Sequence, residues 1–508
     1  MKMNKLPQVT SICFTFLIGI FTSCNQVEHQ NENSAKPNVL IILADDLGYG
    51  DLECYSEKSL IPTPHLNKLA ASGLRFTNAY CPVSVCSPTR YALMTGNYPW
   101  RSWKKKGVMS NYEPSMIDSA LTTLPELMKK AGYHTAGFGK WHLGTSFSTL
   151  DGNQPAGYGK FYAANNGENL DLSQPVSDGP NDHGFDQWMG FSCASECWVF
   201  ENTKIYGALQ HEKYTTEAAP NQEHIQKIPL EEYLEVVTNK TIQYLKNLSG
   251  ETPFFLYYAP YVPHIPLSVS QEFRGKTKAG LYGDYVHELD HYIGKVLSEL
   301  DKSGLSENTI VLFASDNGSQ FKVTNSQMEL EKAGNSPRDS LVVVIDEDTH
   351  QPNANLRGTK WTAWEGGVRT PFIIRWPGKT PEGKVSEQLF ALNDIISSLA
   401  GIIRAKVPEN SAVDSYNMAP VWRGKEEAVR EEVIIQSSGN RFGIRRGNWK
   451  YICSVNFESY TLDDTKAELY NLETDVSEQE NLIGIQLDVG NELKSIMLRK
   501  MNLKAATN

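Results

Sequence analysis

The segment from Cys86 to Gly96 combines a thiol with the local features of an anion-binding site. Pro88 suits the first turn of a helix, Ser87 can cap that helix and Gly96 can end it. Cys86 is therefore expected at a helix N-terminus, where free N–H groups and the helix dipole favour an anion. Arg90 lies one turn later and adds a planar positive group. Taken alone, the pattern fits a buried structural cysteine equally well.

Two polar pairs follow apolar runs that are typical of buried parallel strands. The pairs are Asp45-Asp46, after residues 38–44, and Asp316-Asn317, after residues 308–315. Strand ends of an open α/β sheet meet at one edge, so these side chains are expected to converge. Clustered carboxylate and amide oxygens are ligands that Ca²⁺ prefers. Either pair alone fits a capping turn, but two such pairs with the cysteine between them favour a metal site.

Lysines and histidines stand on further predicted strand-end loops. Lys140 and His142 are two residues apart, so on an extended backbone they would face the same way. His264 lies between prolines that restrict its loop. Lys360 belongs to a glycine-rich stretch. Without further context, each lysine fits a solvated surface residue and each histidine a packing residue.

These segments resemble the signatures of the type I sulfatase family, in the alkaline-phosphatase superfamily. The matching patterns are C-x-P-T-R-x-x-L-x-T-G, G-K-W-H-x-G, H-x-P and G-x-K followed by W-E-G-G-x-R-x-P. One departure is Thr89, where serine is commoner, and it keeps the hydroxyl group. The resemblance covers roughly residues 36 to 400 and implies hydrolysis of a sulfate monoester to an alcohol and sulfate.

The resemblance also implies a cofactor chemistry. A maturation enzyme would convert Cys86 to formylglycine, whose hydrated gem-diol attacks sulfur and forms a sulfated covalent intermediate. Ca²⁺ would be held by Asp45, Asp46, Asp316 and Asn317. The other implied roles are sulfate binding for Arg90, Lys140 and Lys360, general acid for His264 together with Lys360, and base for His142. A gem-diol can expel sulfate by re-forming the aldehyde, without water attacking sulfur.

The chain is long enough for a large core, with 508 residues and a formal net charge of -11. This charge argues against a nucleic-acid partner. The expected fold is α/β, with a large, mostly parallel sheet sandwiched by helices. From about residue 415, short strands with turns between them predict a smaller C-terminal antiparallel sheet. The expected divisions are a catalytic domain at 37–414 and an α+β subdomain at 415–508.

The N-terminus has the pattern of a targeting segment, with lysines before an apolar run too short to span a membrane. Residues 1–23 are expected to be a signal peptide. Small residues directly before Cys24 resemble a bacterial lipobox, which implies lipidation of Cys24. Residues 24–36 read as a polar tether. The expected location is the bacterial periplasm or cell surface, with the membrane touched only through the lipid, and an ordinary secretory signal is the alternative.

Other metal and redox interpretations are weaker. Besides Cys24 and Cys86, an odd number of cysteines follows the predicted signal peptide: Cys54, Cys81, Cys193, Cys197 and Cys453. Their spacing indicates no disulfide framework, although Cys193 and Cys197 could bridge locally. No pair of cysteines has the spacing of a structural zinc site. His287 and His291 are four apart on a predicted helix and could bind a metal, but a solvated face is favoured.

The expected substrate is a sulfated sugar at the end of a glycan, because the protein is predicted to be exported and a general acid suits a poor alkoxide leaving group. The aromatic-rich region 191–222 and a predicted insert at 321–353 are expected to wall the pocket. Two rival functions remain. One is a phosphate or phosphonate ester hydrolase of the same superfamily, and the other is a lipoprotein that binds sulfated glycan without turnover.

Overall fold

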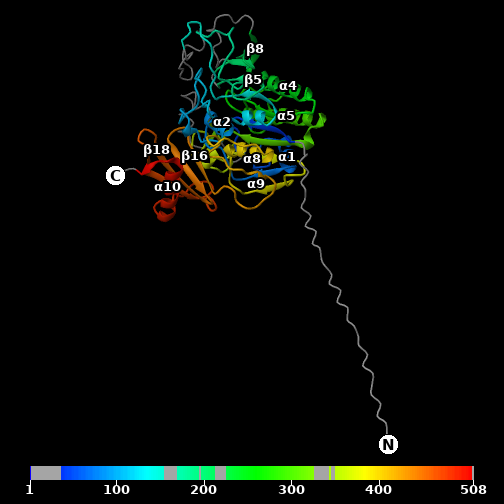
Figure 1. The fold of residues 1–508 in the computed structure, drawn as a ribbon. Helices are drawn as coiled ribbons and strands as arrows, with labels where there is room; N and C mark the ends of the chain where they lie inside the picture. The colour runs from blue at the N-terminus through cyan, green and yellow to red at the C-terminus, as the bar shows by residue number, and fades with distance from the viewer. Residues whose placement is uncertain are drawn as a thin grey trace. The chain divides into compact units, whose positions relative to one another are not determined.

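The computed structural model describes residue 1 and residues 36–153, 169–193, 196–211, 225–324, 342–344 and 349–505 (Figure 1). The predicted signal peptide, Cys24 and nearly all of the predicted tether lie outside the described residues, as do most of the predicted insert and parts of the region 191–222. Pro37–Asn508 form one compact unit. None of the helices in the described ranges has the length and apolar character needed to cross a membrane.

Four adjacent parallel strands form the centre of an 11-stranded sheet, in the order β10-β1-β9-β4. They are β1 (Asn38–Ala44), β4 (His134–Lys140), β9 (Phe254–Ala259) and β10 (Thr309–Ser315). Every residue of β1, β9 and β10 is buried, which explains why their sequences are continuous apolar runs without alternation. The predicted parallel sheet is therefore confirmed.

The sheet continues on both sides with strands of mixed direction. Beyond β10 lie β13 (Phe372–Arg375), β2 (Leu74–Phe76) and β14 (Lys384–Ser386). Beyond β4 lie β5 (Gln187–Phe191), β6 (Trp198–Glu201), β7 (Lys204–Gln210) and β8 (Gln226–Pro229). The strands β6 and β7 are a correction, because this region lacks alternation and was expected to be irregular.

Helices flank the sheet in two groups. The helices α4 (Tyr233–Lys246) and α5 (Gly280–Lys302) lie side by side, and α1 (Pro64–Ala71) packs on α5 (Figure 1). The second group contains α2 (Cys86–Thr95), α3 (Leu124–Lys130), α8 (Ile395–Ile403) and α9 (Ala419–Trp422). Thr123 caps α3 through a capping box with Glu126, as its sequence predicts.

A second, smaller sheet lies toward the C-terminus. Its antiparallel strands are β16 (Glu432–Gln436), β17 (Arg441–Arg446), β18 (Trp449–Asn456) and β19 (Thr461–Asn471), and the short β20 (Lys504–Ala505) runs parallel to β19. The helix α10 (Leu487–Met501) packs on this sheet through Leu493 and Met497. The predicted antiparallel sheet is confirmed.

The remaining elements are short. The amphipathic pattern of residues 389–399 predicts one helix, but the segment begins with a strand and a 3-10 turn before α8. The remaining elements are β3 (Ala79–Tyr80), β11 (Lys322–Thr324), β12 (Val342–Val344), α7 (Glu365–Val368), β15 (Phe390–Ala391) and the 3-10 turns Pro99–Arg101, Leu230–Glu232, Ser306–Asn308 and Leu392–Asp394.

Candidate active site

The ends of the four central strands place their polar residues at one edge of the sheet. Asp45 follows β1, Asp316 follows β10, His264 lies in the loop after β9, and Lys140 is the last residue of β4. Because these strands are adjacent and parallel, their carboxyl ends meet at the same edge, where ligands bind in open α/β sheets. This arrangement brings together residues that are up to 271 positions apart in the sequence.

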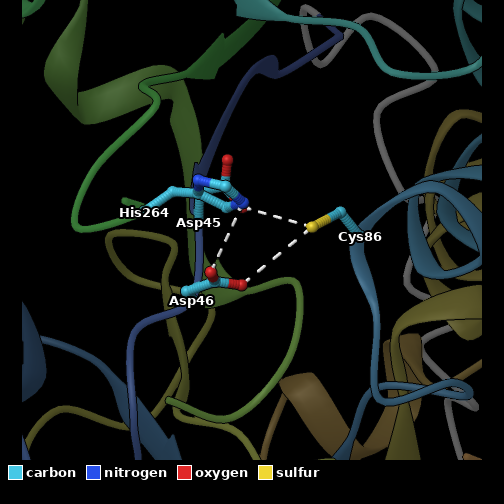
Figure 2. Close-up of side chains that lie close together, drawn as sticks. All are labelled: Asp45, Asp46, Cys86 and His264. Carbon is cyan, nitrogen blue, oxygen red and sulfur yellow. Dashed lines mark hydrogen bonds and ion pairs between the residues drawn. The ribbon is translucent and has the colours of Figure 1, made fainter. Parts of the chain in front are cut away.

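Cys86 faces this edge from the first position of α2 (Figure 2). Its Sγ lies 3.5 Å from Asp45 Oδ1 and 4.0 Å from Asp46 Oδ1, and the side chain is buried. Burial raises the pKa of the Cys86 thiol. The helix begins two residues earlier than a Ser87 cap would place it, with Val85 at the N-cap. Ser87 is therefore not the cap, and its Oγ accepts a hydrogen bond from the Met109 N–H instead.

Three buried carboxylates are paired with three buried cations. We call these six residues the site cluster: Asp45, Asp46, Asp316, Arg90, Lys140 and Lys360. Lys140 Nζ lies 2.6 Å from Asp45 Oδ2, and Lys360 Nζ lies 2.6 Å from Asp46 Oδ2. Arg90 donates from Nε and from a terminal nitrogen to Asp316 Oδ2, at 3.0 and 2.7 Å. Each cation thus neutralises one acid, as buried charges require.

The oxygen donors at this edge fit a hard cation. The ligand atoms of Asp45, Asp46, Cys86 and His264 all lie within 4.8 Å of one another. Asn317 Nδ2 donates to Asp46 Oδ1 at 2.7 Å, while the buried Asn317 Oδ1 has no hydrogen-bond partner among the described residues. A buried amide oxygen without a partner is costly, and a bound cation would satisfy it. The Asp and Asn oxygens therefore form a donor set suited to Ca²⁺.

Burial and neighbouring charges shift the carboxylates in opposite directions. Burial alone raises the pKa of Asp45, but Lys140 and the other nearby cations reverse this and hold that pKa well below its usual range. Burial, reinforced by the charge of Asp45, raises the pKa of Asp316 to about 7. Burial also raises the pKa of Asp46. The acids thus differ in the cost of keeping a negative charge.

His142 has an unusual backbone and a defined tautomer. Its φ is 57°, so the backbone at His142 is not extended. The prediction that Lys140 and His142 face the same way because both lie on an extended backbone is therefore wrong. His142 Nε2 donates to the Met109 carbonyl at 3.3 Å. The buried Nδ1 has no hydrogen-bond partner, and burial together with Lys140 holds the pKa of His142 well below its usual range. A neutral imidazole in this tautomer carries its lone pair on Nδ1.

His264 lies close to the acids and comes from the loop after β9, the strand next to β1 (Figure 2). Its Nδ1 donates to the Ile265 carbonyl at 2.5 Å, and its Nε2 lies 3.6 Å from Asp46 Oδ2. The ring stacks on Tyr261 with 4.7 Å between centroids. Lys140 Nζ lies 5.2 Å from the centroid of the same tyrosine ring. Tyr261 therefore positions one histidine and one lysine of the candidate site.

A family model described as Sulfatase matches residues 37–404.

This chain belongs to the sulfatase family.

Its relatives include an N-acetylgalactosamine-6-O-sulfatase of Bacteroides thetaiotaomicron, 32% identical and covering 94% of this chain and 96% of the relative. Arylsulfatase A of Homo sapiens is 30% identical and covers 92% of this chain and 89% of its own. A solved structure from work on the metabolism of multiple glycosaminoglycans by Bacteroides thetaiotaomicron has a TM-score of 0.74 and 29% identity, covering 92% of this chain and 100% of the other. The resemblance noted from the motifs is therefore confirmed, and the protein is a sulfuric ester hydrolase.

The sulfatase contains site residues that its sequence did not reveal. Tyr257 OH accepts a hydrogen bond from an Arg90 terminal nitrogen at 3.2 Å, and Tyr261 contacts both His264 and Lys140. Both tyrosines belong to the apolar run of β9 and its loop, where an aromatic residue is indistinguishable from core. The only available signal was that this run ends beside His264.

The W-E-G-G-x-R motif contributes to a different buried group in the sulfatase. We call Glu365, Arg369, Lys450 and Glu478 the inter-sheet cluster. Glu365 Oε2 lies 2.5 Å from Arg369 Nε, and Glu365 Oε1 lies 2.8 Å from Lys450 Nζ, which also lies 2.8 Å from Glu478 Oε1. Lys450 belongs to β18, so this cluster joins the α7 segment to the C-terminal sheet.

Two further sequence candidates of the sulfatase lie elsewhere. His287 Nδ1 donates to the Pro62 carbonyl, and His291 packs against Phe273, with 5.0 Å between ring centroids. Among the described residues, the metal-binding group does not include them. The six cysteines that the structure describes form no disulfide with one another. These contacts account for both histidines, and a helix face without a metal stays a prediction.

Proposed function

We propose that this sulfatase removes the 6-O-sulfate of an N-acetylgalactosamine unit at the end of a sulfated glycan, giving a free hydroxyl group and inorganic sulfate. The proposal of substrate rests on the relative from Bacteroides thetaiotaomicron, which is similar over nearly the full length of both chains. The observation that carries the proposed chemistry is the meeting of Cys86 with two acidic strand ends in one buried site.

Cys86 is the proposed position of formylglycine, formed by a maturation enzyme. When hydrated, this group supplies a gem-diol oxygen as the nucleophile. The place of Cys86 supports the proposal, because it lies at the first position of an α-helix, where N–H groups and the dipole favour negative charge. Thr89 holds the turn by donating from its hydroxyl to the Val83 carbonyl at 2.6 Å.

Asp45, Asp46, Asp316 and Asn317 are the proposed ligands of Ca²⁺. The donor set supports this assignment, since it consists of buried carboxylate oxygens and an amide oxygen without a protein partner. Bound there, the ion would supply positive charge that polarises the sulfate group. Arg90 holds Asp316 through two hydrogen bonds and thereby fixes the orientation of one ligand.

Lys140 and Lys360 are proposed to hold the sulfate oxygens. Each ammonium group is buried within 2.6 Å of one of the two adjacent acids, so the two charges flank Cys86 from different loops. In a site that excludes water, such fixed charges stabilise the negative charge that develops on the transferring group. Both lysines are fixed before substrate enters, because ion pairs hold them.

The two histidines are proposed to move protons. His264 would protonate the leaving oxygen of the sugar, since it stands beside Asp46 with its Nδ1 already used by a carbonyl. His142 would take a proton at Nδ1. The Met109 carbonyl supports this role by holding the proton on Nε2, which leaves the lone pair on the nitrogen that has no partner.

A desulfation screen tests the proposed function. Matured enzyme is given 6-sulfated N-acetylgalactosamine, its 4-sulfated isomer, 6-sulfated N-acetylglucosamine and an aryl phosphate, and released sulfate or phosphate is measured. We expect release from the first sugar, and mass spectrometry of the peptide around residue 86 should show formylglycine. Preferred cleavage of the phosphate ester would refute the proposal, as would full activity with unmodified cysteine. Binding of the sulfated sugars without release would support the non-catalytic rival.

We also propose that the enzyme is exported, with residues 1–23 as its signal peptide and Cys24 as the lipidated residue. The motif around Cys24 supports this proposal. Replacing Cys24 with alanine should release the protein from the membrane fraction of the cell. A native protein that is already soluble after cell disruption would indicate an ordinary secretory signal.

A further inference from the structure

A basic and aromatic surface is hydrogen-bonded to the segment that carries Cys86. The run from Arg101 to Lys106 contains four cations in six residues, although the whole chain has a net charge of -11. Arg101 is paired with Asp414 at 2.7 Å, and Lys104 is paired with Glu113 at 2.7 Å. The other two cations of the run are Lys105 and Lys106.

Lys105 and Lys106 form no ion pair with any carboxylate in the part of the chain that the structure describes. Lys105 Nζ donates to Tyr460 OH at 2.7 Å and lies 4.8 Å from the centroid of that ring. Lys106 is exposed. These two lysines therefore present positive charge that a negatively charged ligand could neutralise.

Two exposed aromatic side chains accompany the lysines. Tyr460 is 48% exposed and Trp361 is 38% exposed. Trp361 directly follows Lys360 of the site cluster and has a φ of 77°. Exposed aromatic faces beside cations suit sugar rings that carry negative groups, because the apolar face of the sugar packs on the ring. We call Lys105, Lys106, Trp361 and Tyr460 the strip.

Backbone hydrogen bonds fix the strip to the segment that carries Cys86. Trp361 N–H donates to the Ser84 carbonyl at 2.8 Å, and Ser84 is two residues before Cys86. On the other side of Ser84, its N–H donates to the Gln436 carbonyl at 2.9 Å, and Gln436 Nε2 donates to the Lys105 carbonyl at 2.8 Å.

Ser438 closes the connection within the strip. Its carbonyl accepts from Gly107 N–H at 2.9 Å, and its N–H donates to the Trp361 carbonyl at 3.1 Å. Ser438, in the first turn of the C-terminal sheet, thus connects Trp361 with Gly107, the residue that follows Lys106. The segments of the two lysines and of Trp361 are therefore hydrogen-bonded to the same turn, and Tyr460 joins the strip through its hydrogen bond from Lys105.

We propose that the strip binds the next unit of a polyanionic glycan, a sugar that carries a sulfate or carboxylate group, while the terminal sulfate occupies the site. The lysines would pair with the negative group and the aromatic rings would pack on the sugar. This proposal rests on the proposed function. It predicts that the enzyme prefers an oligosaccharide to the corresponding monosaccharide, and that salt weakens this preference by screening the exposed charges.

The test compares two substrates in matured enzyme. They are 6-sulfated N-acetylgalactosamine and a tetrasaccharide with the same terminal sugar, followed by a uronic acid and a second sulfated sugar. In the native enzyme kcat/KM should be higher on the tetrasaccharide. In the Lys105→Ala, Lys106→Ala double variant the ratio of the two values should fall by about tenfold, since each exposed charge pair contributes up to about 1 kcal/mol.

Matched variants separate this effect from general changes in charge. Lys105→Arg with Lys106→Arg keeps the positive charge and should keep most of the ratio. Lys276→Ala with Lys278→Ala removes two exposed lysines of another segment and should leave the ratio unchanged. Raising NaCl from 0.05 to 0.5 M should lower the ratio in the native enzyme and have little effect on the ratio in the alanine double variant. Equal ratios in the native enzyme and the alanine double variant would overturn the proposal.

A failure of the proposed function is distinguishable from a failure of the strip. If the native enzyme releases sulfate from neither sugar, the function is wrong, and calorimetry then judges the strip by binding of the same tetrasaccharide. Weaker binding to the alanine double variant than to the native protein would still support the strip. Equal binding of the tetrasaccharide to the native protein and to the alanine double variant would refute the strip. A native enzyme with the same kcat/KM on the monosaccharide and the tetrasaccharide would also refute it.

Discussion

The site cluster and the inter-sheet cluster contain similar buried charges, but they differ in the buried polar atoms that lie beside those charges. In the inter-sheet cluster, Glu365 lies within 2.8 Å of both Arg369 and Lys450, so its charge is neutralised inside the protein. In the site cluster the charges are also paired, yet the Asn317 Oδ1 beside them has no partner, and neither does Nδ1 of the neighbouring His142. Buried polar atoms without a partner are rare and costly.

This difference distinguishes a functional cluster of buried charges from a structural one. Both clusters include residues of motifs by which the family is recognised, and both would look alike in a count of buried charges. In the inter-sheet cluster, Glu478 Oε1 makes no hydrogen bond with a described residue but has Lys450 Nζ at 2.8 Å, whereas no described cation is paired with the acceptor atoms beside the site cluster, which also lies beside Cys86, the proposed position of the nucleophile. Substitutions at the site cluster and at Cys86 are therefore expected to change activity, whereas substitutions in the inter-sheet cluster are expected to change stability.

The largest expected effect is on activity at Cys86. Cys86→Ala should lower kcat/KM on a sugar sulfate by a factor on the order of 10⁴ to 10⁶, because no nucleophile remains. The thermal midpoint should change little, since the hydrogen bonds of the thiol to described residues are long, at 3.5 and 4.0 Å. Activity assays and differential scanning calorimetry measure the two quantities. Cys453→Ala, in the core of the C-terminal sheet, is the control that should keep activity, and a Cys86 variant with more than about a hundredth of native activity would contradict the assignment.

A smaller effect on activity is expected at His264. His264→Ala should lower kcat/KM on a sugar sulfate by ~10²- to 10⁴-fold, but much less on an activated aryl sulfate, whose phenolate leaves without a proton. The comparison of the two substrates is the measurement. His291→Ala serves as a control on α5. Equal losses on both substrates would remove His264 from the role of general acid.

The inter-sheet cluster should respond through stability. Lys450→Met leaves Glu365 and Glu478 buried with one cation fewer, and should lower the free energy of unfolding by about 3–5 kcal/mol. Urea denaturation measures this change. Lys494→Met removes a partly exposed pair with Asp464 and should cost less than about 1 kcal/mol. If Lys450→Met kept native stability but lost activity, the distinction between the clusters would be wrong.

An effect on stability that depends on pH is expected at Glu196, a buried acid that has no ion pair with a described residue. Its Oε1 accepts from Tyr112 N–H at 2.6 Å, and burial raises its pKa to about 8. The folded protein keeps this proton up to about pH 8, whereas the unfolded chain loses it near 4.5, so stability falls as pH rises between these values. Glu196→Gln removes this dependence. The thermal midpoint of the variant relative to the native protein should therefore rise from pH 5 to pH 8, and a constant difference would contradict the shift.

The central strands and the C-terminal sheet were predictable because their signals are local. The apolar run within Asn38–Ala44 is followed by two acids, and the short strands expected after about residue 415 form the antiparallel sheet of β16 to β19. The strands β6 and β7 were not predictable, because their residues do not alternate and their pairing depends on β5.

The positions of the candidate site residues followed from strand ends, whereas their detailed geometry did not. The left-handed backbone of Asp46 and His142, with φ of 66° and 57°, has no signal in a single sequence, because only the fold imposes it. The partner of Glu365 was equally hidden. Lys450 lies 85 positions away, and no local pattern links the two residues.

The bonds between the C-terminal sheet and the rest of the chain have a consequence for how this protein can be divided. Gln436 is hydrogen-bonded to the turn before Cys86, and Lys450 shares the neutralisation of Glu365 with Arg369, so a fragment that ends at residue 414 would leave Glu365 with one of its two cations and would loosen the turn before Cys86. The same holds for recombination between relatives. Exchanging the last hundred residues would preserve a working enzyme only if the donor sequence supplied equivalents of both contacts.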